Sequence, residues 1–161
     1  MRDGKRRGGV PPADCDARIR RLFDYWQSIH PAGGGLPGRR HVEPLHLPEL
    51  LRWLCLIDVA REPLRFRYRL VGTGQVQALR RDLTGQWLDA ALPDFERSTA
   101  YADLVAVAAG AIRYRRGPPD IPLKDGDALM ERLLLPLAQE GSRVDMILGM
   151  TLYQESGRTR P

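Results

Sequence analysis

Four side chains of this 161-residue sequence are candidate nucleophiles: Ser28, Cys55, Ser98 and Ser142. A serine or cysteine becomes a catalytic nucleophile beside a base or in a motif that lowers its pKa. None of the four stands in such a motif. The carboxylates of Asp58 and Glu131 fall in predicted strands, where neighbouring arginines such as Arg67 are their ordinary partners. We therefore expect no enzymatic activity.

Two glycine-containing segments invite a ligand-binding interpretation. Gly72-Thr73-Gly74 resembles the start of a dinucleotide-binding loop, but the G-x-G-x-x-G fingerprint requires a third glycine where Gln77 stands. These glycines are therefore expected to end a strand and lead into a helix. Asp82-Leu83-Thr84-Gly85 has the composition of a capped turn, in which the glycine takes a positive φ.

The histidines do not form a metal-binding pattern. His30, His41 and His46 lie in or beside predicted loops, and a structural zinc site needs a second pair of Cys or His residues elsewhere. Cys15 and Cys55 do not form a disulfide framework, which is typical of a protein from a reducing compartment. We therefore expect no metal and a cytoplasmic location.

The formal net charge is +5, which raises the question of nucleic-acid binding. The basic residues are mostly arginines scattered along the chain rather than gathered in one stripe, so nucleic acid is not the expected partner. The longest apolar run, at 104–112, is far shorter than the roughly 20 residues that span a bilayer. No membrane insertion is expected.

The most regular pattern is the alternation at 64–73 (LRFRYRLVGT), which places Phe66, Tyr68 and Leu70 on one face of a strand. Arginines occupy the other face, which is expected to be in water. Further strands are predicted at 53–60, 111–115, 130–137 and 144–152, and helices at 16–30 and within 73–109. The predicted fold is α+β, a five-stranded antiparallel sheet with a helical crossover between its second and third strands and an N-terminal flanking helix.

Both ends of the chain lack the apolar content of the middle. Residues 1–13 are rich in Gly, Pro and basic side chains, and residues 156–161 form a short polar end. Segments of this composition bury too little surface to offset the entropy of ordering. We expect disordered tails at 1–13 and 156–161 and one domain at 14–155.

Several short motifs are distributed over residues 15–153. They are Tyr25-Trp26, the Pro37-Gly-Arg-Arg loop, Pro44 before Leu50-Leu51, Ile57-Asp58, FRYRLVGT at 66–73, Asp82-Leu83-Thr84-Gly85 and ERLLLPL at 131–137. Together with the order of the strands and the crossover, they resemble a PAS-like domain family of bacterial proteins. The resemblance implies a PAS fold and a sensory or regulatory role without catalysis.

The same resemblance bears on cofactors. Haem is bound in some PAS domains by a histidine on the central long helix, and flavin photosensors use a cysteine between the second and third strands. This chain has neither residue at those places. Haem and flavin are therefore disfavoured, and the identity of any cofactor stays unknown.

PAS-like folds leave a cavity between the sheet and the crossover, and the alternation predicts its lining. The expected ligand-binding residues are Phe66, Tyr68, Leu70, Thr73, Leu83, Trp87, Leu134, Met146 and Leu148. This lining suits a small organic ligand, and it equally suits a packed core. Tyr68 distinguishes the two, because a buried phenol needs a hydrogen-bond partner.

The predicted first helix carries an apolar stripe that is expected to cover the sheet or to form a dimer interface: Leu22, Phe23, Trp26 and Ile29. The leading hypothesis is a non-catalytic sensory or regulatory module that binds a small ligand. It would signal through protein–protein contacts, as a homodimer or with a partner signalling protein. The alternative is a protein-interaction adaptor with a filled core that acts through dimerisation and its exposed sheet face.

Overall fold

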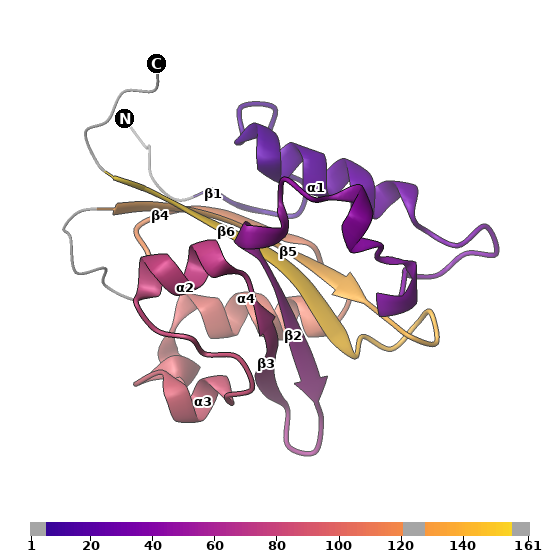
Figure 1. The fold of residues 1–161 in the computed structure, drawn as a ribbon. Coiled ribbons are helices and arrows are strands. Elements are labelled where there is room, and N and C mark those ends of the chain that lie inside the picture. The colour runs from indigo at the N-terminus through magenta and orange to yellow at the C-terminus, as the bar shows by residue number, and fades with distance from the viewer. Residues whose placement is uncertain (1–5, 121–127, 156–161) are drawn as a thin grey trace.

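The fold is built on one six-stranded antiparallel sheet (Figure 1). The computed structural model describes residues 6–120 and 128–155. The strands are Arg6–Gly8 (β1), Leu54–Ala60 (β2), Arg65–Val71 (β3), Arg113–Gly117 (β4), Ala128–Leu137 (β5) and Met146–Glu155 (β6). Their order across the sheet is β1-β4-β5-β6-β2-β3. The five strands predicted from the sequence are confirmed, and β1 adds a sixth at one edge.

Helices occupy the connection from β3 to β4, which confirms the predicted crossover. The α-helices are Ala17–Ser28 (α1), Thr73–Leu79 (α2), Leu88–Ala91 (α3) and Thr99–Ala108 (α4), and the 3-10 turns are Arg39–His41 (η1), Pro44–His46 (η2), Leu51–Trp53 (η3) and Phe95–Arg97 (η4). α1 covers one face of the sheet, and α2, α3 and α4 lie on the other (Figure 1). The expectation of a water-exposed sheet face is wrong for most of the sheet, because each face is packed against its own apolar cluster. It holds only at edge strand β3, where the side chains of Arg67 and Arg69 are 41% and 56% exposed.

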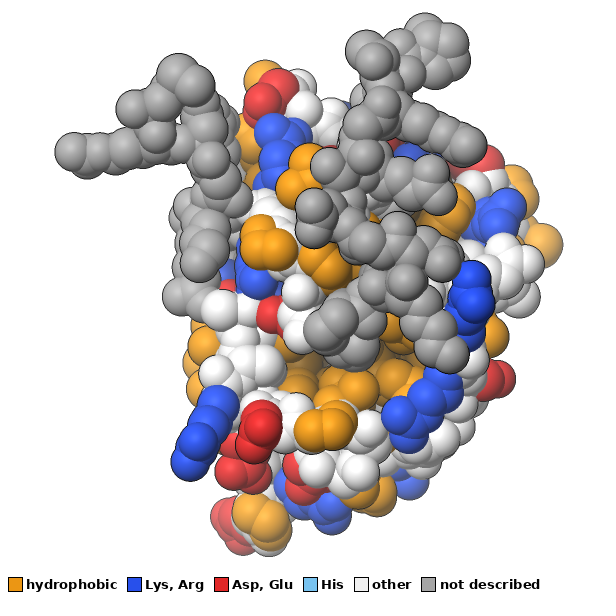
Figure 2. Space-filling view, turned by 90° about the vertical axis from the view of Figure 1, so that its left-hand side faces the viewer, with side chains coloured by type: hydrophobic (Ala, Val, Ile, Leu, Met, Phe, Trp, Pro, Cys, Tyr) orange, Lys and Arg blue, Asp and Glu red, His pale blue; other side chains and the backbone are white. Residues whose placement is uncertain are grey.

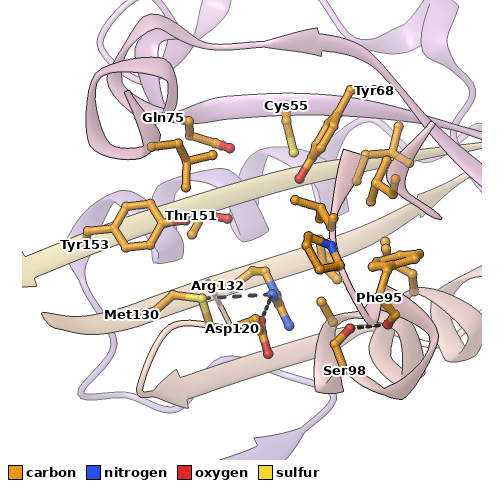
Figure 3. Close-up of a pocket in the computed structure, with 18 residues that line it drawn as sticks. Cys55, Tyr68, Gln75, Phe95, Ser98, Asp120, Met130, Arg132, Thr151 and Tyr153 are labelled. Carbon is orange, nitrogen blue, oxygen red and sulfur yellow. Dashed lines mark hydrogen bonds and ion pairs between the residues drawn. The ribbon is translucent and has the colours of Figure 1, made fainter. Parts of the chain in front are cut away.

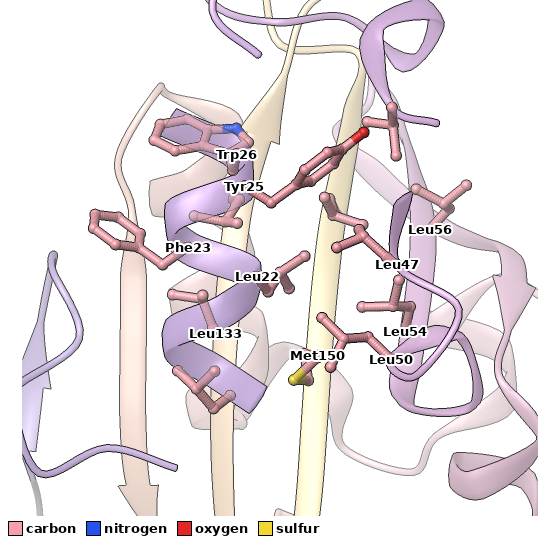
Figure 4. Close-up of a cluster of buried hydrophobic side chains, with 14 of the residues drawn as sticks. Leu22, Phe23, Tyr25, Trp26, Leu47, Leu50, Leu54, Leu56, Leu133 and Met150 are labelled. Carbon is pink, nitrogen blue, oxygen red and sulfur yellow. The ribbon is translucent and has the colours of Figure 1, made fainter. Parts of the chain in front are cut away.

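The flanking helix α1 packs on the sheet of its own chain (Figure 4). It begins at Asp16, whose side chain accepts a hydrogen bond from the backbone N–H of Arg18 at 2.9 Å. Trp26 Nε1 donates a hydrogen bond to the carbonyl of Pro136 at 3.1 Å. The residues proposed for a dimer interface belong to this core or pack against it: Leu22, Phe23, Trp26 and Ile29. Their assignment to an interface is wrong, because packing on the sheet removes the stripe from the surface.

Part of the segment expected to form a disordered tail is ordered. Arg6–Gly8 pairs with β4. The guanidinium of Arg20 donates hydrogen bonds to the carbonyls of Pro11 and Pro12 at 2.8 and 2.9 Å, which ties this segment to α1. The predicted domain boundary at residue 14 is therefore too late. Residues 1–5 and 156–161, where the rest of the predicted tails fall, lie outside the described residues.

A β-bulge interrupts the alternation of β3. Ile57 pairs with Tyr68 and Leu56 pairs with Leu70, so Arg69 is the extra residue. Tyr68 keeps its place on the side of α2, α3 and α4. Leu70 shares the opposite face with Leu56 and is 47% exposed. The placement of Leu70 in a cavity is wrong, because one inserted residue turns the following side chains to the other face.

Candidate functional site

A cavity of about 80 Å³ lies between the sheet and the crossover helices. Figure 2 shows a hollow lined by hydrophobic side chains on the side of the molecule where α2 and α3 lie. Strands β2, β3, β5 and β6 form one wall of the cavity, and α2, α3, η4 and α4 form the other (Figure 3). The polar lining residues are Cys55, Tyr68, Gln75, Ser98, Asp120, Arg132, Thr151 and Tyr153. The wall is otherwise apolar, with Ile57, Leu88, Phe95, Leu104, Met130 and Leu134 among its members.

Two of the predicted ligand-binding residues line this cavity. Tyr68 contributes from β3 and Leu134 from β5, as the sequence pattern indicated. Phe66 lies on the same face of the sheet, but it is buried against Tyr101, with a distance of 6.2 Å between ring centroids, and does not line the cavity.

The predicted orientation of β6 is wrong. Met146 and Leu148 pack on the α1 side of the sheet. Ile147 faces the crossover helices, and Thr151 and Tyr153 line the cavity. Apolar residues occupy both faces of β6 because both are covered, so hydrophobicity alone does not select one of them.

Three predicted ligand contacts in the crossover lie elsewhere. Thr73 is exposed at the first position of α2. Leu83 is buried without lining the cavity. Trp87 lies under the guanidinium groups of Arg65 and Arg67, which are 4.2 and 5.2 Å from its ring centroid. Their assignment to the cavity is wrong. The helices of this region are too short for a helical period in the sequence to show which side faces the sheet.

The two glycine-containing segments have the structural roles that the sequence indicated. Gly72 joins β3 to α2. In the capped turn, the backbone N–H of Thr84 donates to Asp82 Oδ1 at 2.9 Å, and Gly85 has φ of 83°. Neither segment reaches the cavity.

Buried ion pairs form the polar floor of the cavity. Arg115 of β4 and Arg132 of β5 are directly opposite each other on the sheet. Arg132 Nη2 lies 2.9 Å from Asp103 Oδ2, and its Nη1 lies 2.8 Å from Asp120 Oδ2. Arg115 Nη1 lies 3.0 Å from Asp120 Oδ1, which also accepts a hydrogen bond from Thr99. We call these five residues the ion-pair cluster.

The ion-pair cluster contains two arginines and two aspartates, and none of these four side chains is more than 12% exposed. Burial alone would raise the pKa of Asp120. The charge of Arg132, hydrogen bonds from Thr99 and Arg132, and the charge of Arg115 nevertheless hold that pKa below its usual value. Asp120 is therefore ionised at neutral pH, and its charge offsets one of the two arginines.

Three hydroxyl groups reach the cavity wall, from Tyr68, Thr151 and Tyr153. The hydroxyl of Tyr68 points into the cavity (Figure 3). Within residues 6–120 and 128–155, no side-chain hydrogen bond engages any of the three. Burial raises the pKa of Tyr68 above its usual range and that of Tyr153 to about 12. Both tyrosines are therefore neutral donors at pH 7.

Three of the four candidate nucleophiles have structural surroundings, and the fourth, Ser142, is exposed in the connection between β5 and β6. Burial raises the pKa of the Cys55 thiol to about 11, so it stays protonated at neutral pH. Ser98 caps α4, because its Oγ donates to the carbonyl of Phe95 at 2.5 Å and accepts from the N–H of Tyr101. The hydroxyl of Ser28 donates to a carbonyl in the preceding turn at 2.6 Å. None of these three side chains is paired with a base.

Of the two strand carboxylates, Asp58 has the arginine partners that were expected, whereas Glu131 has a mixed set of partners. Asp58 pairs with Arg67 at 3.1 Å and with Arg69 at 3.0 Å. Glu131 accepts hydrogen bonds from the backbone N–H of Asp16 at 2.8 Å and the hydroxyl of Tyr114 at 3.0 Å. It therefore fixes the start of α1 against the sheet and does not face Asp58.

Two of the three histidines have local backbone partners, and the ring of His46 packs edge-on against Tyr25. His30 Nδ1 lies 2.9 Å from the carbonyl of Trp26, and His41 Nδ1 accepts the N–H of Gly38 at 2.9 Å. Within residues 6–120 and 128–155, no three His, Cys, Asp or Glu side chains are placed to hold a metal ion. The helices in the same ranges are too short or too polar to cross a bilayer.

An antiparallel sheet with a helical crossover on one face, α1 on the other and a cavity beneath the crossover is the architecture of a PAS-type α+β domain. Residues 16–152 match the model of the PAS domain family, so the chain belongs to that family, as the sequence motifs suggested. PAS domains are sensory and regulatory modules, and this one has the α+β fold expected from the sequence. No curated protein matches the chain.

One similar solved structure is that of an RNA-binding Light-Oxygen-Voltage receptor. Its TM-score is 0.48 at 14% sequence identity, and the match covers 92% of this chain and 38% of that chain. This chain thus spans well under half of the receptor's length.

Proposed function

We propose that this PAS domain is a non-catalytic sensory module that binds a small organic ligand in the cavity between its sheet and its crossover helices. The observation that supports this proposal is a mostly apolar wall with hydroxyl groups that have no partner among the described residues. A packed core usually pairs such groups, whereas a binding site leaves them for the ligand. A cytoplasmic location and a protein partner for signalling belong to the same proposal.

The size of the cavity limits the occupant. Its volume of about 80 Å³ is close to half that of the ~150 Å³ engineered cavity that binds benzene. A ligand of a few heavy atoms fits without rearrangement. A larger ligand requires α2, α3 and α4 to move away from the sheet, which would carry its presence to the surface.

Native mass spectrometry of the purified chain, at low and rising activation energy, tests this proposal. We expect an adduct that leaves on activation. A variant that fills the cavity, Ala100→Leu on α4, should lose the adduct, because Ala100 lines the cavity and leucine adds three carbon atoms. The matched control is Ala102→Leu, an exposed position on the same helix.

An adduct that survives Ala100→Leu would place the ligand elsewhere. A bare mass, together with no binding of any small molecule in a solution screen, would refute the proposal. The same spectra report whether the chain is a monomer or a homodimer.

The second candidate function is a protein-interaction adaptor with a filled core. The small cavity favours it, since ordinary ligand pockets measure about 300–1,000 Å³. Such an adaptor would act through dimerisation or through the arginines of edge strand β3, of which Arg69 is the most exposed. Reversing the charge of Arg69 with Arg69→Glu should then abolish capture of an acidic partner, whereas a cavity ligand should be unaffected.

A further inference from the structure

We propose that the cavity selects an uncharged ligand, and that Arg132 is a fixed part of its wall and does not anchor an anion. This inference rests on the function proposed above and specifies the chemical class of its ligand. It follows from the way in which the charges of the ion-pair cluster are matched before any ligand binds.

Arg132 has its two terminal nitrogens engaged by different carboxylates. Nη2 lies 2.9 Å from Asp103 on α4, and Nη1 lies 2.8 Å from Asp120, which precedes β5. The side chain of Arg132 is 10% exposed. A carboxylate ligand could bind Arg132 only by displacing one of these partners. Displacement would leave Asp103 as a buried charge without its cation, or would leave Asp120 with Arg115 alone. That exchange is unfavourable, because an unpaired buried charge costs far more than a neutral polar group.

The remaining described lining offers no second charge. Arg132 is the sole cation and Asp120 the sole carboxylate among the described residues that line the cavity. Burial keeps the pKa values of Tyr68 and Cys55 high, so both side chains are neutral at pH 7. An ion that entered would therefore face a site whose charges already balance.

The polar groups that are available point to a neutral hydrogen-bonding ligand. The hydroxyls of Tyr68, Thr151 and Tyr153 face the cavity and have no partner within the described ranges. They suit a carbonyl, amide or hydroxyl group, while the apolar wall near Leu88 and Leu104 suits a short hydrocarbon end. The volume of about 80 Å³ restricts this ligand to a few heavy atoms.

The test compares propionamide with propionate, which have the same shape and differ in charge. Each is titrated into uniformly ¹⁵N-labelled wild-type protein at pH 7 and constant ionic strength, and amide shifts around the cavity are followed by NMR. We expect propionamide to bind at least tenfold more tightly than propionate. Tyr68→Phe should weaken propionamide binding by roughly 2- to 13-fold, the effect of one hydrogen bond.

A charge-altering variant tests the reason for this selectivity. Asp120→Asn removes one negative charge from the ion-pair cluster, so the site should gain affinity for propionate relative to propionamide. The matched control is Asp89→Asn, which removes the carboxylate that pairs with Arg65 away from the cavity. It should leave the affinities for propionate and propionamide unchanged. Circular dichroism checks that each variant is folded, and the comparison on wild-type protein needs no variant.

Equal or tighter binding of propionate to the wild-type protein would overturn the inference and leave the sensory function standing. Failure of propionamide to bind at all would also overturn it. The proposed function itself is judged separately, by the mass-spectrometric adduct and its loss in Ala100→Leu.

Discussion

Removing Arg132 from the ion-pair cluster should destabilise the domain severely. The variant Arg132→Met keeps an unbranched apolar side chain but leaves the carboxylate of Asp103, which is 4% exposed, without the cation that lies 2.9 Å away. Breaking a buried pair in this way costs about 3–5 kcal/mol. The reciprocal variant Asp103→Leu should cost a similar amount, because Arg132 then retains only Asp120.

The double variant Arg132→Met/Asp103→Leu separates pairing from burial. Both charges of the pair are gone, and Asp120 keeps Arg115 as its partner at 3.0 Å. We therefore expect the double variant to recover most of the loss and to lie within about 2 kcal/mol of the wild type, since a buried ion pair replaced by apolar groups is often neutral.

Urea unfolding followed by circular dichroism measures these differences. With a slope of about 2 kcal/mol per molar urea, each single variant should lower the midpoint by about 2 M. In thermal scans the corresponding loss in Tm is about 6–20 °C for a domain of this size. Single variants that each cost less than about 1 kcal/mol would behave as surface pairs do, and would refute the description of this cluster as buried and matched.

Three further predictions concern other parts of the chain. The folded-state pKa of Asp120 is lowered. Its ionised carboxylate therefore stabilises the fold above the unfolded-state pKa of about 3.9, and this stabilisation is lost as pH falls through the folded-state pKa. The difference in unfolding free energy between the wild type and Asp120→Asn should shrink below about pH 4. Gly72→Ala should cost about 1–3 kcal/mol in urea unfolding, because the new methyl group meets the backbone carbonyl of Leu51 at 2.6 Å. Its control, Gly33→Ala, has nothing within 4 Å and should change stability little. The Cys55 thiol should react with a disulfide reagent at pH 8 only as fast as the domain opens, because the residue is only 3% exposed and burial raises its pKa to about 11. Rapid reaction of the folded protein would contradict this.

Local patterns were sufficient for most of the architecture. The apolar stripe of α1 has a helical period and an N-cap at Asp16, and the alternation up to Tyr68 marks a strand, so both elements could be placed from the sequence. Their packing partners depend on distant residues. Whether α1 covered its own sheet or a second copy could not be decided until its contact with Pro136 was known.

The cavity could be predicted only in part, for two physical reasons. First, a period of two assigns faces correctly only while the strand is regular, and the bulge at Arg69 reverses the assignment for Leu70. Second, a strand covered on both sides carries apolar residues at both odd and even positions. Hydrophobicity alone therefore could not show which face of the sheet Leu148 lies on.

The ion-pair cluster was missed because its members are far apart in the sequence. Glu131 and Arg132 stand together in β5, directly before the apolar run 133–137, and charges at this place in a strand were the available signal of a buried pair. The Arg132 partners Asp103 and Asp120 come from a helix and a loop that only the tertiary fold brings to it.

The sheet divides the interior into two cores, which have no buried residue in common. Successive residues of β5 alternate between them, with Leu133 and Leu135 in the α1 core and Leu134 in the cavity wall. Substitutions in the cavity wall can therefore accumulate while the α1 core continues to hold the sheet together. An engineer who wished to change the ligand would redesign Met130 and Leu134 of β5, keep Arg132 with its ion pairs, and leave the odd-numbered neighbours untouched.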